Sequence, residues 1–141
     1  MKRIGHRATA FLLCAVLLFG LSISASARES QCISSYDVKV SAVGNGKVSI
    51  QISILATDAM QELGAKMIVV NEKQANGSYK AVYTFTPDGY ASLIAKDRVN
   101  FAVKTTYQGT SGKQYYITAQ LYAKNAKASS TIWAGSQTVK A

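Results

Sequence analysis

Few side chains in this sequence could carry out nucleophilic or metal-assisted chemistry. The only histidine is His6, and the only cysteines are Cys14 and Cys32. His6 and Cys14 lie in the segment 1–27, which we expect to be removed from the working protein. Without them, a Ser-His-Asp triad, a Cys-His dyad and the usual zinc sites are excluded. No glycine-rich phosphate loop is present either, so we expect no metal ion or other cofactor.

Carboxylates offer another route to enzyme chemistry, since a pair of them can act as acid and base on a glycosidic bond. Asp58 and Glu62 are four residues apart and would share one face of a short helical turn. The alternative, which we favour, is that Asp58 only caps this turn and Gly64 ends it. A Ser-Lys pair is also conceivable, but no spacing indicates one, so we expect no enzyme activity. The carboxylates available for a pair are Asp37, Asp58, Glu62, Glu72, Asp88 and Asp97.

Cys32 would be the only thiol left after removal of the segment 1–27. A lone thiol in a secreted chain could join two chains through a disulfide. The alternative, which we favour, is a small and partly buried side chain at the start of the first strand. We therefore expect a monomer.

The segment 1–27 has the three parts of a secretory signal peptide. Lys2, Arg3 and Arg7 make a basic start, 10–19 is apolar, and Ala25 and Ala27 form a small-x-small cleavage site. A retained membrane anchor is disfavoured because the apolar core has ten residues, whereas spanning needs roughly 20. A lipoprotein is disfavoured because a bulky leucine precedes Cys14. We expect cleavage after Ala27 and secretion to the outside of the cell.

Cleavage would leave the chain 28–141, which is long enough for one domain that buries about two-thirds of its unfolded surface. The loss of Lys2, Arg3 and Arg7 lowers the net charge from +9 to +6. Residues 28–35 are polar and are expected to be flexible. Residues 36–141 are expected to form the single domain.

After residue 35 the apolar side chains recur at every second position, which is typical of half-buried strands. Turn residues separate about seven such segments, and every neighbouring pair can be antiparallel. This predicts an all-β fold, a single antiparallel β-sandwich or, less favoured, a small barrel. Residues 88–97 could be a helical turn or a loose strand. The expected strands are 36–43, 48–55, the two arms of a hairpin within 68–85, 98–107, 114–123 and 130–139.

Asn76-Gly77 predicts a two-residue hairpin turn with positive φ at both positions. Counting outward from that turn, Lys73 lies opposite Lys80, so this face must be in water. The other face is expected to point inward. Its members are Ile68, Val70, Tyr83 and Phe85.

Two stretches carry a resemblance to known proteins. Asn76-Gly77 is followed by Tyr79 and Phe85, and a later strand reads 112–117, Gly-Lys-Gln-Tyr-Tyr-Ile. Over roughly 65–139 the chain resembles small immunoglobulin-like or fibronectin-III-like proteins secreted by Gram-positive bacteria. The resemblance implies an extracellular β-sandwich with no inherited activity, and makes Tyr115 the candidate for a tyrosine corner.

The charge of +6 suits an anionic partner such as teichoic acid, peptidoglycan carboxylates or anionic lipid headgroups. Lys66, Lys73 and Lys80 are the candidate contacts, expected near the hairpin. The alternative is that scattered lysines keep the sheets soluble and unpaired. No nucleic-acid partner is expected, since there is no run of Lys and Arg.

Aromatic rings offer a second binding mode, because exposed rings can stack on sugars. Tyr116 and Tyr122 should point outward if Tyr115 points in, whereas Trp133 is expected in the core. The function that follows is a secreted, non-catalytic protein that binds or decorates the cell envelope, or acts in adhesion. A secreted effector or bacteriocin-like protein and a small carbohydrate-binding module are the alternatives. The rings available are Tyr90, Tyr107, Tyr116, Tyr122 and Trp133.

Overall fold

The computed structural model describes residues 31–141, which form nine strands and one turn of 3-10 helix. The predicted signal segment, with Ala25 and Ala27, lies outside the described residues. In chain order the elements are β1 (Ile33–Gly44), β2 (Lys47–Met60), β3 (Glu62–Lys73), β4 (Tyr79–Phe85), η2 (Ala91–Leu93), β5 (Ile94–Ala95), β6 (Arg98–Gln108), β7 (Gln114–Lys124), β8 (Ser129–Gly135) and β9 (Val139–Lys140).

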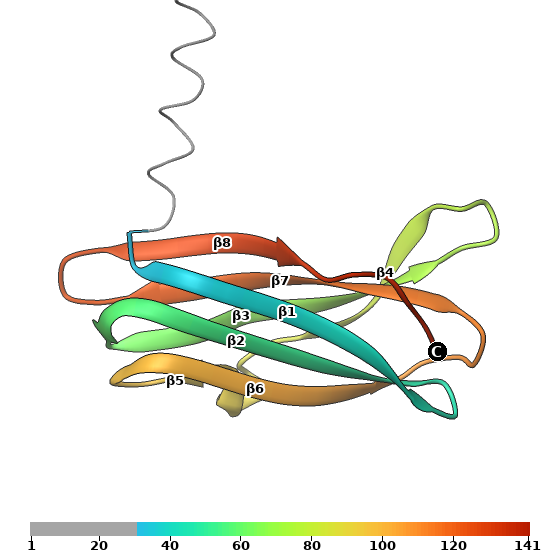
Figure 1. Cartoon of the computed structure of the whole chain (residues 1–141), viewed down its shortest axis with the longest axis horizontal. Helices are drawn as coiled ribbons and strands as arrows, with labels where there is room; N and C mark the ends of the chain where they lie inside the picture. Colours follow the sequence, from blue (N-terminus) through green and yellow to red (C-terminus); the bar gives the residue numbers. More distant parts are fainter. Residues whose placement is uncertain (1–30) are drawn as a thin grey trace, which may run out of the picture.

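The strands form two antiparallel sheets that face each other in a sandwich-like arrangement (Figure 1). The smaller sheet has the order β1-β2-β6, and the larger has the order β4-β3-β7-β8. The larger sheet also includes β5 beside β3 and β9 beside β7. The all-β antiparallel prediction is confirmed. Seven long strands are present in the described chain, and the two-residue strand β9 is an addition that the sequence did not predict.

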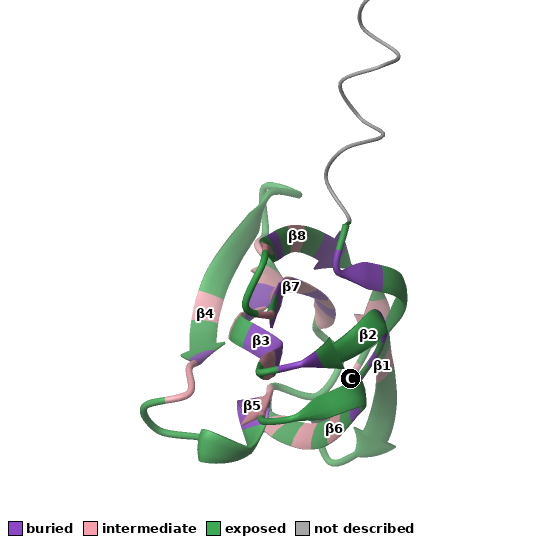
Figure 2. Cartoon of the chain, turned by 90° about the vertical axis from the view of Figure 1, so that its left-hand side faces the viewer, coloured by how far each residue is buried: buried purple, intermediate pink, exposed green. Residues whose placement is uncertain are grey.

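Both sheets turn an apolar face inward, as the period of two predicted (Figure 2). Alternate residues of β2 and β7 are at most 3% exposed, and each aliphatic side chain so buried stabilises the fold by about 1.5–3 kcal/mol. Between these positions, the intervening side chains point away from the core. The inward residues are Val48, Ile50, Ile52 and Ile54 on β2, and Tyr115, Ile117, Ala119 and Leu121 on β7.

The chain passes from one sheet to the other between β2 and β3 through a single residue, Gln61. The helical turn expected here, with Asp58 as its cap, is wrong, because Asp58 is a strand residue of β2 and Glu62 begins β3. The break in alternation marks this crossing between sheets. Just beyond it, Gly64 pairs with β7 on one side and β5 on the other.

The hairpin of β3 and β4 has the predicted register at its base but not at its tip. Its turn has three residues rather than two, since the Gln74 N–H bonds the Ser78 carbonyl at 2.7 Å. Only Gly77 has a positive φ there, +86°, so the expected turn type is wrong. A bulge at Val82 restores the register, and Ile68 lies opposite Phe85 as predicted.

The bulge changes which lysines meet. Lys80 lies opposite Glu72, and Lys73 lies opposite Tyr79, so the expected Lys73–Lys80 pair is wrong. Like charges are thereby kept from facing each other directly.

The segment after the hairpin contains both of the structures left open for 88–97. It forms the 3-10 turn η2 and then β5, and Leu93 on η2 is buried. The Tyr90 carbonyl accepts a hydrogen bond from the Leu93 N–H at 3.0 Å.

Strand β1 begins at Ile33, earlier than predicted, and the end expected to be flexible is packed from Cys32 onward. The Cys32 N–H donates to the Ser130 hydroxyl at 3.1 Å, and its carbonyl accepts from Thr57 N–H at 3.0 Å. These bonds tie the start of β1 to β8 and to β2. Within residues 31–141, no helix is long and apolar enough to cross a membrane.

Cys32 is only 2% exposed, so the reactivity of its thiol is a direct test of this packing. We expect the native thiol to react with an aromatic disulfide reagent about 100-fold more slowly than in denaturant. We also expect one band of monomer mass on non-reducing electrophoresis. A rapidly reacting native thiol, or a disulfide dimer, would contradict the packing of this end of the chain.

Candidate functional site

The outer face of the larger sheet carries a row of aromatic rings. Because Tyr115 and Leu121 on β7 are fully buried, Tyr116 and Tyr122 point to the opposite side, as predicted. Trp133 on β8 lies opposite Gln120 of β7, which is also an outward position. We call this surface the aromatic face. It is defined by Tyr79, Tyr116, Tyr122 and Trp133.

Trp133 does not lie in the core, so that prediction is wrong. The tryptophan is 56% exposed, and its neighbour Ala134 is buried in its place. The reason is register, because Ala134 lies opposite Ala119 and Ile132 opposite Leu121, both inward positions of β7. Burying Trp133 would require a shift of one residue, which would expose Ala134 and Ile132 instead.

Lys66 lies at one end of the aromatic face, and its ammonium sits 4.0 Å from the centre of the Tyr122 ring. The register of β3 against β7 shifts between Ala65 and Met67, so Lys66 occupies a bulge. Tyr122 is diagonal to Trp133 across the β7–β8 ladder, a separation of about 7–8 Å. A cation and two rings are therefore within reach of one bound group.

Tyr79 and Tyr116 form the other end of the aromatic face. Their rings meet edge to face with centroids 4.7 Å apart. Beside them in the ladder, Asn71 lies opposite Tyr116 and is only 9% exposed. Its amide donates to the Val69 and Tyr116 carbonyls at 3.3 and 3.4 Å. A hydrogen-bonded amide with little exposure therefore lies beside Tyr116 in the ladder.

The three candidate lysines are not gathered at one place. Lys73 and Lys80 are both on the hairpin, but they face opposite sides. Lys80 lies opposite Glu72, and Glu72 directly precedes Lys73 on β3, so the two point to opposite faces. Lys66 is seven residues back along β3, roughly 20 Å away. Lys66 and Lys73 therefore belong to the outer face, and Lys80 does not.

Tyr90 and Tyr107 are not part of the aromatic face. They join Tyr83 and Phe85 in a cluster near the edge strands β4 and β6, with centroid separations of 4.7–5.7 Å. Tyr83 is 41% exposed rather than buried, and its hydroxyl hydrogen-bonds that of Tyr90 at 3.0 Å. This bond is the main cause of the raised pKa of Tyr90, and burial is the main cause of the raised pKa of Tyr107.

Glu72 holds two side chains of the neighbouring strand and loop at once. Its Oε1 is 2.9 Å from the Lys113 ammonium, and its Oε2 accepts from the Tyr115 hydroxyl at 2.8 Å. That hydroxyl in turn accepts from the Thr110 N–H at 2.8 Å, the upstream backbone contact expected of Tyr115. The hydrogen bond from Lys113, followed by that from Tyr115, lowers the pKa of Glu72. We interpret this group as a structural clamp on the loop before β7.

Within residues 31–141, no contact brings two of the other carboxylates together as an acid-base pair. Asp37 forms an exposed ion pair with Lys39 at 3.1 Å. Asp58 accepts a hydrogen bond from the Ala59 N–H at 2.7 Å. In the described part of the chain, no three His, Cys, Asp or Glu side chains come together as metal ligands would.

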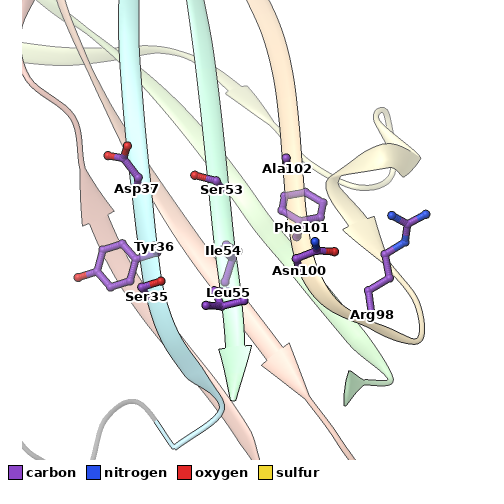
Figure 3. A pocket seen from close by; sticks show the side chains of 10 residues that line it. All are labelled: Ser35, Tyr36, Asp37, Ser53, Ile54, Leu55, Arg98, Asn100, Phe101 and Ala102. Atoms are coloured by element: carbon purple, nitrogen blue, oxygen red, sulfur yellow. The ribbon is translucent and has the colours of Figure 1, made fainter. Parts of the chain in front are cut away.

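The outer face of the smaller sheet has a depression that sequence analysis missed. It has a volume of about 500 Å³ and lies over β1, β2 and β6. Figure 3 shows Ser53 and Leu55 on β2, between Asp37 on β1 and Asn100 on β6. The small outward residues of β2 were the signal that could have revealed it. We call it the hollow, with outward side chains Ser35, Asp37, Ser53, Leu55, Arg98 and Asn100.

No protein-family model and no curated protein matches the chain. Among solved structures, it is similar to a late embryogenesis abundant protein at 12% identity and a TM-score of 0.47, over 99% of this chain and 88% of that one. It is also similar to the Bacillus subtilis sporulation control protein Spo0M at 7% identity and a TM-score of 0.45, over 78% of this chain and half of that one. A third similar structure is a family 76 glycoside hydrolase from a bovine Bacteroides thetaiotaomicron strain. Its sequence identity is 11% and its TM-score is 0.37, over 78% of this chain and a fifth of that one.

Proposed function

We propose that the protein is secreted and binds an anionic glycan polymer of the cell envelope through its aromatic face, without catalysis. The observation that carries this proposal is Trp133, a large ring left 56% exposed on the outer face of a sheet. Exposed tryptophan is unusual because its burial would stabilise the fold. A ring in this position is suited to stack on the apolar side of a sugar.

The preference for an anionic polymer follows from Lys66. Its ammonium is held 4.0 Å from the Tyr122 ring, which lowers the number of side-chain positions it samples. A carboxylate or phosphate on a sugar stacked against Trp133 would lie close to this cation. The net charge of the expected secreted chain, +6, draws such polymers toward the surface.

The setting of this activity is also a proposal. The signal-like segment 1–27 supports export, and export brings the chain to the envelope. We propose an immunoglobulin-like or fibronectin-III-like type for the sandwich, as in small proteins secreted by Gram-positive bacteria. Its support is the Tyr115 hydroxyl, which bonds the backbone of Thr110 five residues upstream.

Substitution of the exposed tryptophan tests the proposed function. We expect Trp133→Ala to weaken binding to purified cell walls roughly 30-fold, because loss of a central aromatic contact costs about 2 kcal/mol. The control is Tyr90→Ala, which removes a ring that is 38% exposed and is not part of the aromatic face. Binding is measured by sedimentation with the walls across a salt series.

A comparison of intact walls with walls stripped of teichoic acid tests the anionic preference separately from the role of the aromatic face. Weaker binding to stripped walls, with a steep salt dependence, would support the anionic preference. Equal wall binding by Trp133→Ala and the unchanged protein would overturn the role of the aromatic face. Circular dichroism of each variant shows whether its fold is retained.

A further inference from the structure

We propose that the hollow on the smaller sheet is a second site for the same glycan polymer, so that one protein molecule can tie two polymer chains together. This inference rests on the proposed function of the aromatic face. The two sheets form opposite outer surfaces of the sandwich (Figure 2). The hollow lies on the smaller sheet, and the aromatic face lies on the larger one. About 10 Å separates two such sheets, so one short glycan segment cannot occupy both surfaces.

The side chains of the hollow have the chemistry of a sugar site. Ser35, Ser53 and Asn100 present hydroxyl and amide groups that both donate and accept hydrogen bonds. Sugar hydroxyls also do both, so pairing does not depend on one fixed orientation. Leu55, which is 46% exposed, gives an apolar surface beside these polar groups for the carbon-bound hydrogens of a sugar ring.

The shape of the region favours an extended chain over a small molecule. A second depression of about 310 Å³ continues from the hollow along the same face, and both share Asp37 and Ser53. Across the sheet the floor spans three strands, about 10 Å from β1 to β6. A shallow channel of this kind can hold successive units of a polymer.

The charges of this region suit an anionic polymer. Asp37 is paired with Lys39 at 3.1 Å, so the negative charge of the hollow is already matched. Arg98 on the hollow and Lys104 on the continuing depression add two cations without acidic partners among the ion pairs of residues 31–141. The region as a whole is positive.

A peptide is a weaker fit to the hollow. Peptides that bind sheets add to an open edge by pairing backbone groups. The floor of the hollow is β2, whose backbone is paired with β1 on one side and with β6 on the other. Only side chains are available there, and these carry the hydroxyl and amide groups that sugars use.

Calorimetric titration with a muramidase-solubilised wall fragment that carries teichoic acid tests this second site. The unchanged protein should bind two fragments per chain. Ser53→Leu with Asn100→Ala should bind one, with the affinity of the remaining site within about twofold, since both residues are exposed and far from the aromatic face. The control is Thr106→Leu, an exposed residue on the same face outside the hollow, which should still bind two.

A second readout measures the bridging itself. Beads coated with the same fragment should aggregate with the unchanged protein, and the hollow variant should lower the light-scattering signal at least about tenfold. One fragment per unchanged chain, or undiminished aggregation by the hollow variant, would overturn the inference. So would amide shifts at Ser53 on adding the wall stem peptide without sugar.

The two proposals can fail separately. If Trp133→Ala binds one fragment and the hollow variant still binds two, only the proposal of the second site is wrong. If Trp133→Ala leaves both the affinity and the two-fragment stoichiometry unchanged, the aromatic face is wrong. If no fragment binds to the unchanged protein, both are overturned.

Discussion

Replacement of Gly64 by alanine is expected to destabilise the protein by at least about 3 kcal/mol. A Cβ at this position would lie 1.9 Å from the Leu93 carbonyl oxygen and 2.9 Å from the Leu93 carbonyl carbon. Both atoms belong to the backbone, so no side-chain rotation can relieve the contact. The strand pairs of Gly64 with Tyr122 and Ile94 must therefore separate, on one side or the other.

The measurement is urea unfolding of the variant against the unchanged protein, with the free energy of unfolding as the result. Gly89→Ala is the matched control, because no atom lies within 4 Å of a Cβ there and its φ is not positive. This control should change stability by less than about 1 kcal/mol, and in the stabilising direction if at all. Equal effects of the two substitutions would contradict the close approach of η2 to β3.

The prediction of strands succeeded where one face of a strand is in the core and the other is in water. In β2, apolar and polar residues alternate from Val48 to Ile54, and both of these end residues are buried. In β7 the same alternation placed Tyr116 and Tyr122 outward. Such patterns are readable because each residue type reports directly on the side that it faces.

Interruptions of that alternation were misread, because sequence does not show which strand lies opposite. The single-residue crossing at Gln61 breaks the pattern in the same way as a helical turn would. The bulge at Val82 and the three-residue turn at Gly77 cancel each other, so the register at Ile68 was right although the tip was wrong. Only the paired strand reveals such compensation.

The candidate site was predicted in part for a similar reason. Trp133 was assigned to the core from residue type alone, yet its partner Gln120 shows that it faces outward. The hollow depends on β6, which is distant in the sequence from β1 and β2, and the pairing places Asp37, Ser53 and Ala102 in one row. A site built across a sheet becomes visible only when the order of its strands is known.

Removal of the Tyr115 hydroxyl, as Tyr115→Phe, is expected to destabilise the protein by about 1–3 kcal/mol. The change leaves the ring in the core but removes the partner of the Thr110 N–H and one donor to Glu72. Tyr115→Ala also creates a cavity, and it should cost about 3–5 kcal/mol. Urea unfolding at pH 7 measures both, and Tyr116→Phe is the control, since no side-chain hydrogen bond of the described chain uses its hydroxyl.

Acid unfolding separates the hydrogen bond to Glu72 from ring packing. The pKa of Glu72 is lowered in the folded protein, by Lys113 first and then by Tyr115, so its contribution is fully present above the ordinary pKa of the unfolded chain. That contribution is lost as the pH falls through the lower folded pKa.

Because Tyr115→Phe removes one cause of the lowered pKa of Glu72, the stability deficit of this variant should shrink between pH 7 and pH 3. Glu72→Gln, which cannot titrate, should abolish this pH dependence of the deficit. A deficit of equal size at both pH values would mean that Tyr115 stabilises the fold only through the Thr110 backbone, and that the clamp does not depend on the charge of Glu72.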